Sequence, residues 1–148
     1  MIFGWLFFLD RLNTRKNLRK KTILDSDVCL RCSRTVEDRD HMFFSCPAAS
    51  WIWPATGIQP CSTSMADFFA TPLPHALPTT VRPFMLLLIL WKIWDAHNKK
   101  VFQSLDADVN SSITIIISDL IIWSHRLKNE TIRGHAGLWR EFLSSHHL

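Results

Sequence analysis

The sequence predicts a mainly α-helical protein, and three features support this assignment. Near the N-terminus, apolar residues recur at three- and four-residue spacing, which gives a helix one apolar stripe. Residues 80–103 form a second, longer helical pattern, and a group of cysteines and one histidine lies between the two. The chain of 148 residues suits one domain, or one small module with a helical extension.

Residues 2–21 are predicted to form two helices. Asn13 and Thr14 can cap the second, over residues 15–21, with Leu18 facing inward and the basic side chains facing water. The apolar stripe of the first helix would consist of Trp5, Phe8, Leu9 and Leu12.

Four residues of metal-ligand type follow within residues 29–46, in the pattern C-x2-C-x8-H-x4-C. They are Cys29, Cys32, His41 and Cys46. Two cysteines separated by two residues can aim both sulfurs at one point, and the His-x4-Cys pair can complete the four N/S ligands of a closed structural Zn²⁺ site. The predicted fold class is therefore mainly α, with a small zinc-stabilised CCHC loop between N-terminal helices and a C-terminal helical bundle.

Other interpretations of these residues remain open. The cysteines can be small buried hydrophobes, with His41 an ordinary polar residue. Cys61 can replace His41 as fourth ligand, at the cost of a longer loop closure; otherwise we expect it to be a free thiol. A catalytic zinc would keep one position for water and use Glu37 or Asp40 as base, but we expect residues 33–40 to be a solvated loop or a short ribbon.

The chain leaves this cluster through a short helix that Ser45 can cap and Pro47 can open. Four of the seven prolines then fall in residues 57–79, where we expect one helical turn at residues 65–70. The predicted division is residues 1–56 as the zinc-binding module with basic helices, 57–79 as a Pro-rich connector and 80–148 as the C-terminal helical region.

In the C-terminal region, residues 80–103 are predicted to form the longest helix. Residues 85–89 are apolar all round, which indicates burial on several faces. A helix over residues 113–128, whose Ile-rich first half also suits a strand, and a short helix over residues 139–143 complete the chain. One face of the long helix is expected to hold Trp91, Trp94 and Phe102.

The excess positive charge lies beside the cysteine cluster. Residues 1–35 hold eight basic and three acidic side chains, whereas the remainder holds nine and ten. Such asymmetry is typical of proteins that bind nucleic acid or another acidic partner, and a solvated helix face is the alternative. The eight candidate phosphate-binding residues are Arg11, Arg15, Lys16, Arg19, Lys20, Lys21, Arg31 and Arg34.

The sequence predicts neither a membrane span nor a secretory signal. No segment reaches the roughly 18 uncharged apolar residues that a spanning helix needs. The apolar start lacks a basic beginning and runs into Asp10. Cysteines without a signal indicate a reducing compartment, so we expect the nucleus or the cytoplasm.

Several stretches match one family pattern. They are Leu9-Asp10-Arg11-Leu12-Asn13-Thr14-Arg15 with Leu18, Cys29-Leu30-Arg31-Cys32, Glu37, and Asp40-His41-Met42-Phe43-Phe44-Ser45-Cys46-Pro47 with Trp53. Together they resemble the zinc-binding domain that follows the reverse transcriptase in plant LINE-type retrotransposon polyproteins. Residues 91–102 are similar to the W-x-x-W-x-x-R-N-x-x-x-F stretch of that family, with His97 in place of the arginine.

This resemblance implies a zinc-binding domain that contacts RNA or DNA, with polymerase sequence upstream in a longer parent protein. The polymerase or ribonuclease H domain of such a polyprotein is an expected partner. The chain contains no Tyr, hence no Tyr-x-Asp-Asp polymerase motif, and no spaced acidic set like that of a ribonuclease H. We therefore expect a non-catalytic module, or a fragment of a degenerate insertion.

Two functions follow from these observations. In the first, the basic side chains neutralise phosphates while Phe43, Phe44 or Trp51 stacks on exposed bases. In the second, the apolar residues of 84–94 and 113–123 dock on a polymerase domain.

Overall fold

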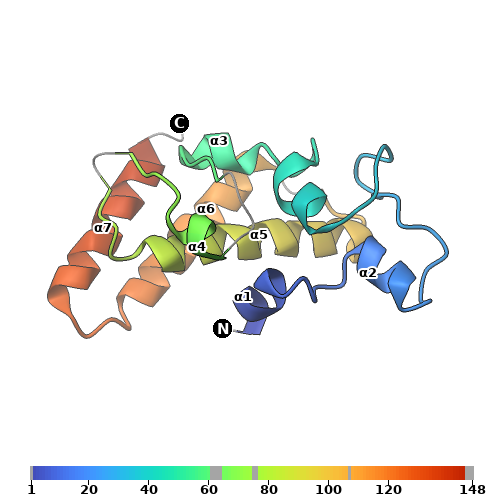
Figure 1. Ribbon diagram of the computed structural model, residues 1–148. Helices are drawn as coiled ribbons and strands as arrows, with labels where there is room; N and C mark the ends of the chain where they lie inside the picture. Colours follow the sequence, from blue (N-terminus) through green and yellow to red (C-terminus); the bar gives the residue numbers. More distant parts are fainter. Residues whose placement is uncertain (1, 61–64, 75–76, 107, 146–148) are drawn as a thin grey trace.

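A computed structural model of the chain describes residues 2–60, 65–74, 77–106 and 108–145, and it is mainly helical (Figure 1). Across these residues, the β pairing consists of one isolated antiparallel bridge between Val28 and Val36. The predicted fold class is confirmed. The helices are α1 (Ile2–Phe8), α2 (Arg15–Lys20), the single π-helical turn η1 (His41–Ser45), α3 (Ile52–Thr56), α4 (Met65–Phe69), α5 (Arg82–Gln103), α6 (Val109–Ser124) and α7 (Glu130–Ser145).

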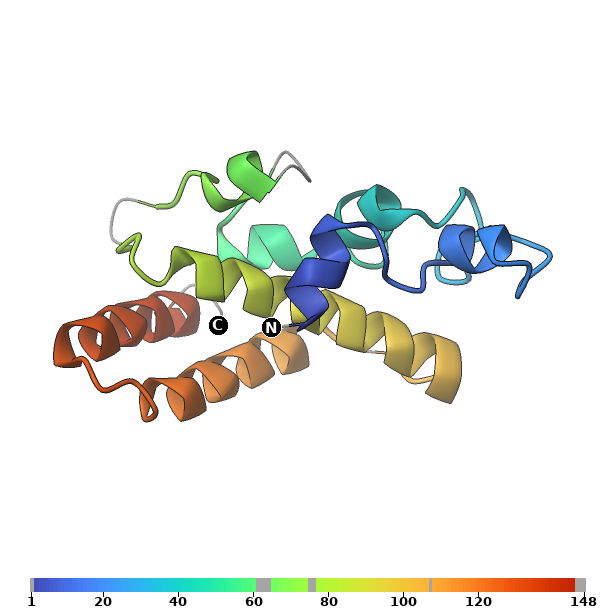
Figure 2. The same ribbon diagram turned by 60° about the horizontal axis from the view of Figure 1, so that its bottom comes forward.

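Helix α5 forms the centre of the molecule. Figure 2 shows α6 and α7 side by side along one flank of α5, with α1 lying against α5, while α3 contacts α6 and η1 contacts α5. Its first half is apolar on almost every side, and this explains how one helix can pack against several others. Burial of residues 85–89 on several faces is confirmed for four of the five, which are Met85, Leu86, Leu88 and Ile89. No helix in the described parts of the chain is long and apolar enough to cross a membrane.

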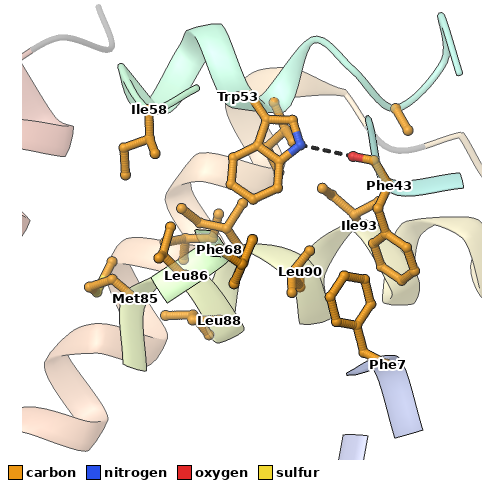
Figure 3. Close-up of a cluster of buried hydrophobic side chains, with 14 of the residues drawn as sticks. Phe7, Phe43, Trp53, Ile58, Phe68, Met85, Leu86, Leu88, Leu90 and Ile93 are labelled. Carbon is orange, nitrogen blue, oxygen red and sulfur yellow. Dashed lines mark hydrogen bonds between the residues drawn. The ribbon is translucent and has the colours of Figure 1, made fainter. Parts of the chain in front are cut away.

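One continuous apolar core joins α5 to the segment that carries the predicted metal ligands. Phe43 of η1 lies against Phe7, with ring centroids 5.0 Å apart, and both face Leu90 and Ile93 of α5 (Figure 3). The Trp53 Nε1–H donates a hydrogen bond of 2.8 Å to the Phe43 carbonyl oxygen. Because this bond is buried, it fixes η1 relative to α3 as well as to α5.

The same core contains residues from all three predicted parts of the chain. Ile58, Phe68 and Leu77, which belong to the expected connector, are buried in it. The helical turn expected at residues 65–70 is α4. Whether the three parts are separate domains stays a prediction.

Helix α1 approaches α5 closely through its glycine. A Cβ atom added at Gly4 would lie 3.0 Å from the Leu87 Cδ2 atom, a distance at which the leucine would have to shift. The predicted stripe is correct for Leu12, which is buried, and for Phe8, which is half-buried, but wrong for Trp5 and Leu9, because Phe3 and Phe7, one turn apart, take the inward positions of α1. Trp5 is therefore 59% exposed and Leu9 is also exposed.

The second half of α5 and the start of α6 also differ from the prediction. In α5, Phe102 is 77% exposed and Trp91 is 40% exposed, so the expected apolar face of Trp91, Trp94 and Phe102 is not buried as a unit. Helix α6 starts at Val109, four residues before the predicted residue 113, because the Asp108 carboxylate accepts hydrogen bonds from backbone N–H groups of its first turn.

Helix α7 is much longer than the predicted residues 139–143. It packs beside α6, and its Trp139 is buried with Nε1–H donating to the Pro78 carbonyl oxygen at 3.1 Å. The helix at residues 47–53 is shorter than expected, since residues 47–51 are turns and α3 begins at Ile52.

A buried carboxylate links the cysteine-bearing loop to α5. The Glu37 side chain is 0% exposed, and its Oε1 atom lies 3.2 Å from His97 Nε2 and accepts the Arg15 N–H at 3.0 Å. Burial raises the pKa of Glu37, but the hydrogen bond and charge of His97, with the Arg15 N–H, outweigh it and leave that pKa below its ordinary value. A fully solvated loop over residues 33–40 is therefore wrong at Glu37.

Replacing His97 by alanine should lower the free energy of unfolding by about 3 kcal/mol, because it leaves the Glu37 carboxylate buried without its imidazole partner. Chemical denaturation of the single variants His97→Ala and Glu37→Gln and of the double variant measures the coupling. We expect the double variant to lose less than the sum of the two single losses. Additive losses would contradict the pair.

The lowered pKa of Glu37 also determines in which direction the free energy of unfolding changes with pH. The carboxylate contributes stability above its ordinary pKa of 4.5, and this contribution disappears as the pH falls through the lowered folded value.

Candidate metal centre

The structure brings the four predicted ligands together. The metal-binding atoms of Cys29, Cys32, His41 and Cys46 all lie within 4.8 Å of one another. The Sγ atoms of Cys29 and Cys46 are 3.9 Å apart, and Cys32 Sγ is 3.4 Å from His41 Nε2. Zn–S bonds of about 2.3 Å and Zn–N bonds of about 2.0 Å give tetrahedral edges of about 3.8 Å for S–S and 3.5 Å for S–N. The two measured distances match the edges of a tetrahedral zinc site, and the four side chains together are able to hold a metal ion.

The first pair of ligands is presented by a tight turn. The Ser33 N–H donates to the Cys29 carbonyl oxygen at 2.9 Å, and the Cys29 N–H donates to the Thr35 carbonyl oxygen at 2.8 Å. Ser33 has a φ of 58°, the left-handed conformation that reverses the chain after Cys32. Both sulfurs therefore face the same side of the turn.

The second pair is presented by the π-helical turn η1. His41 is its first residue and Cys46 follows its last, and the Cys46 N–H donates to the His41 carbonyl oxygen at 2.8 Å. The Asp38 carboxylate accepts the His41 N–H at 2.8 Å and holds the start of the turn. A spacing of four intervening residues matches the i→i+5 bond of a π turn, so this local geometry places the imidazole and the thiol together.

Hydrogen bonding orients the imidazole of His41. Its Nδ1 atom lies 3.0 Å from the Thr35 hydroxyl, which leaves Nε2 directed at the sulfur cluster. Histidine ligands commonly use their second nitrogen in this way. The predicted apolar cover is present, because Met42 and Phe43 are buried and Phe44 is partly buried.

The two cysteines of the first pair have opposite electrostatic environments. Burial raises the pKa of the Cys29 thiol to about 12. The backbone N–H of Arg34 is the largest influence on Cys32 and lowers the pKa of its thiol to about 6. A metal ion that enters the site must therefore displace the Cys29 proton, whereas Cys32 already offers a thiolate near neutral pH.

Two of the alternatives, buried apolar cysteines and a catalytic zinc, receive no support from this geometry. Buried hydrophobic cysteines would not need an imidazole nitrogen beside Cys32 Sγ. Glu37 is committed to His97 and Arg15, while Asp40 is exposed. Cys61, the rival fourth ligand, and His75 lie outside the described residues.

The eight candidate phosphate-binding residues divide into two groups. Four already have polar partners within the chain: the Arg15 guanidinium donates to the Ser26 carbonyl oxygen at 3.2 Å, Arg19 pairs with Asp27 at 2.9 Å, Lys21 Nζ donates to Asn13 Oδ1 at 3.4 Å and Arg31 donates to the Ala48 carbonyl oxygen at 2.9 Å. The exposed members of the whole set are Arg11, Arg19, Lys20, Lys21 and Arg34, and Lys16 is half-buried.

The expected stacking residues are less available than the sequence suggested. Phe43 is fully buried, and the Trp51 Nε1–H is bound to the Ala48 carbonyl oxygen at 2.6 Å. The structure instead exposes Trp5, with the Arg11 guanidinium 5.8 Å from its ring centroid. Sequence reasoning missed this pair because it assigned Trp5 to the buried stripe.

The purified protein should retain its metal ion, and the cysteine-bearing loop should need that ion to keep its structure. We expect one zinc ion per chain by native mass spectrometry, and loss of protection from hydrogen exchange over residues 25–50 after chelation or in the Cys32→Ser variant, with α6 and α7 affected less. Cys61→Ser is the matched control and should keep its metal. Metal loss in that control, or unchanged exchange in Cys32→Ser, would contradict the assignment.

Comparison with known proteins agrees with this site. Residues 1–53 match the family model for zinc-binding in reverse transcriptase, and that range contains all four ligands. No curated protein and no solved structure matches the chain. The N-terminal part of the chain is thus similar to the zinc-binding domain of reverse transcriptases, and its four Cys and His side chains form a cluster able to hold a metal ion.

Proposed function

We propose that the chain is a non-catalytic, zinc-binding module of a retroelement reverse transcriptase of the plant LINE type, and that it binds RNA or DNA in the nucleus or cytoplasm. The observation that carries the proposal is an exposed basic groove between α1 and α2, the helix whose first turn is hydrogen-bonded to the metal-bearing loop. Its metal would be Zn²⁺, held by Cys29, Cys32, His41 and Cys46.

The groove lies between the end of α1 and the last turn of α2. It encloses about 580 Å³ and is lined by three basic side chains, of Arg11, Lys20 and Lys21, and one acidic side chain, of Asp10. The Asp10 carboxylate accepts a hydrogen bond from Asn17 Nδ2 at 3.3 Å, so part of its charge is already engaged. The groove therefore presents a net positive surface to a phosphate backbone.

The metal loop would position this groove. Between the two ligand pairs, the Glu37 carboxylate accepts the Arg15 N–H and the Glu37 carbonyl oxygen accepts the Lys16 N–H at 3.1 Å. These two N–H groups belong to the first turn of α2, which has no helical partner for them. Zinc binding at residues 29–46 thus stabilises the helix that ends in Lys20, and the metal acts as a structural rather than a catalytic element.

Nucleic-acid binding should fall steeply with salt. Each phosphate contact contributes a slope of about −0.7 for single strands or −0.9 for duplexes in log K against log salt. The double variant Lys20→Ala, Lys21→Ala should make that slope shallower by about 1.4 to 1.8. Fluorescence anisotropy of labelled oligonucleotides at several salt concentrations measures this.

The matched control removes two positive charges at the opposite end of the molecule, where α6 turns into α7 (Figure 1). Lys128→Ala, Arg133→Ala should bind like the wild type. A slope near zero for the wild type, or equal weakening by both double variants, would refute nucleic-acid binding by the groove.

A second candidate function is docking on the polymerase domain of a parent polyprotein. Most of the apolar residues of 84–94 are buried. Helix α6, however, exposes Ile115 and Ile122, which lie two turns apart on the same face of the helix. The similarity of residues 1–53 to a reverse transcriptase domain favours a polymerase as partner.

Charge substitution on this face tests the docking. Ile115→Glu, Ile122→Glu should abolish co-purification with a reverse transcriptase polymerase domain of a plant LINE-type element, because burying the two carboxylates is unfavourable. Leu30→Glu, an exposed change on the metal loop, should have no effect. Retained co-purification by the α6 variant would contradict this candidate.

A further inference from the structure

We propose that the ligand of the basic groove is single-stranded RNA or DNA, with one unpaired base stacked on Trp5. This inference rests on the proposed function and adds to it the strand state of the ligand and a residue that contacts a base.

The indole of Trp5 is available as a stacking surface. It lies on α1, where Phe3 and Phe7 take the core positions, and it is 59% exposed. Stacking on a base would remove much of this apolar area from water, and every base offers a flat π face to an aromatic ring.

Arg11 connects this ring to the groove. Its guanidinium lies 5.8 Å from the Trp5 ring centroid, and the same residue lines the groove with Lys20 and Lys21. A phosphate bound by these three side chains would therefore hold its base near the indole. Proteins that bind single strands combine the same two elements, a basic track and an aromatic platform beside it.

The apolar part of the groove favours an unpaired ligand as well. Leu6 and Leu9 line it beside the basic residues, and Leu9 is exposed. Sugars and unstacked bases present apolar surface that such residues can cover, whereas a duplex keeps its bases stacked on both faces. A paired base would have to leave its stack to reach Trp5, at a cost of a few kcal/mol.

The test compares ligands that differ only in their bases. Wild-type protein with bound zinc is titrated with a labelled thymidine dodecamer, an adenosine RNA dodecamer, an abasic dodecamer of equal charge and a duplex of the same length. We expect both single strands to bind at least about 5-fold more tightly than the abasic strand. Trp5→Ala should remove that difference, and Trp5→Phe should keep part of it.

A second tryptophan provides the matched control. Trp123 is 42% exposed, and the Arg126 guanidinium lies 5.8 Å from its ring centroid, which is the same arrangement on α6. Trp123→Ala should leave the affinity for single strands unchanged. Equal thermal stability of the Trp5 variants and the wild type, expected for an exposed side chain, separates lost stacking from lost folding.

The outcomes separate this inference from the proposed function. If abasic and normal strands bind equally, or if Trp5→Ala binds the thymidine strand like the wild type while Lys20→Ala, Lys21→Ala does not, only the inference fails. If a peptide rich in glutamate and leucine displaces the strand at equal concentration, the inference that the groove binds a single strand with a base stacked on Trp5 is also overturned. If no nucleic acid binds, the proposed function fails.

Discussion

The structure depends on the convergence of three thiols and one imidazole on a single small volume. Two of the thiols are almost completely removed from water, and the burial of Cys29 raises its pKa far above neutrality. A divalent cation reverses this situation, because coordination stabilises the thiolates that burial disfavours. With the ion bound, the turn at Ser33 and the π turn at His41 are held in one position relative to each other, although neither is part of a sheet or a long helix.

Two anchors attach this metal loop to α5. One is apolar: Phe43 packs against Phe7, and both rings face Leu90 and Ile93 of α5 (Figure 3). The other is polar: Glu37 reaches His97 on α5 and the first turn of α2. Because the polar anchor contacts α2 as well, the basic groove, the metal loop and the long helix form one connected unit. The proposed nucleic-acid contact therefore relies on parts of the chain that are almost a hundred residues apart.

The metal ligands could be predicted because their evidence is local. The spacing of Cys29, Cys32, His41 and Cys46 is visible within eighteen residues, and tight turns translate it directly into geometry. The long helix α5 was predictable for a similar reason, since its pattern repeats over many turns. The Thr14 cap was also correct: its hydroxyl accepts the Asn17 N–H at 3.1 Å.

The remainder depends on contacts between distant residues. Glu37 and His97 are sixty residues apart, and a single sequence holds no sign that they meet. In α1, both Trp5 with Phe8 and Phe3 with Phe7 have helical spacing, and the positions of Phe43, Phe68 and Trp91 decide which pair is buried. The length of helix α7 was underestimated because its surface residues are polar. This length follows from the packing of α7 against α6.

The π turn between His41 and Cys46 has a consequence for how this segment can vary among related chains. Removing one residue from it would produce an ordinary α-helical turn and rotate the following side chain by about 100° around the helix axis. The sulfur of Cys46 would then leave the position it shares with the other donors. In the stretch between Cys32 and Asp38, the Val28–Val36 bridge and the contacts of Thr35 and Glu37 fix the register of residues 35–37, but Ser33 and Arg34 have no such periodic constraint. Insertions and deletions in related chains should therefore accumulate between Cys32 and Asp38 and be absent between His41 and Cys46.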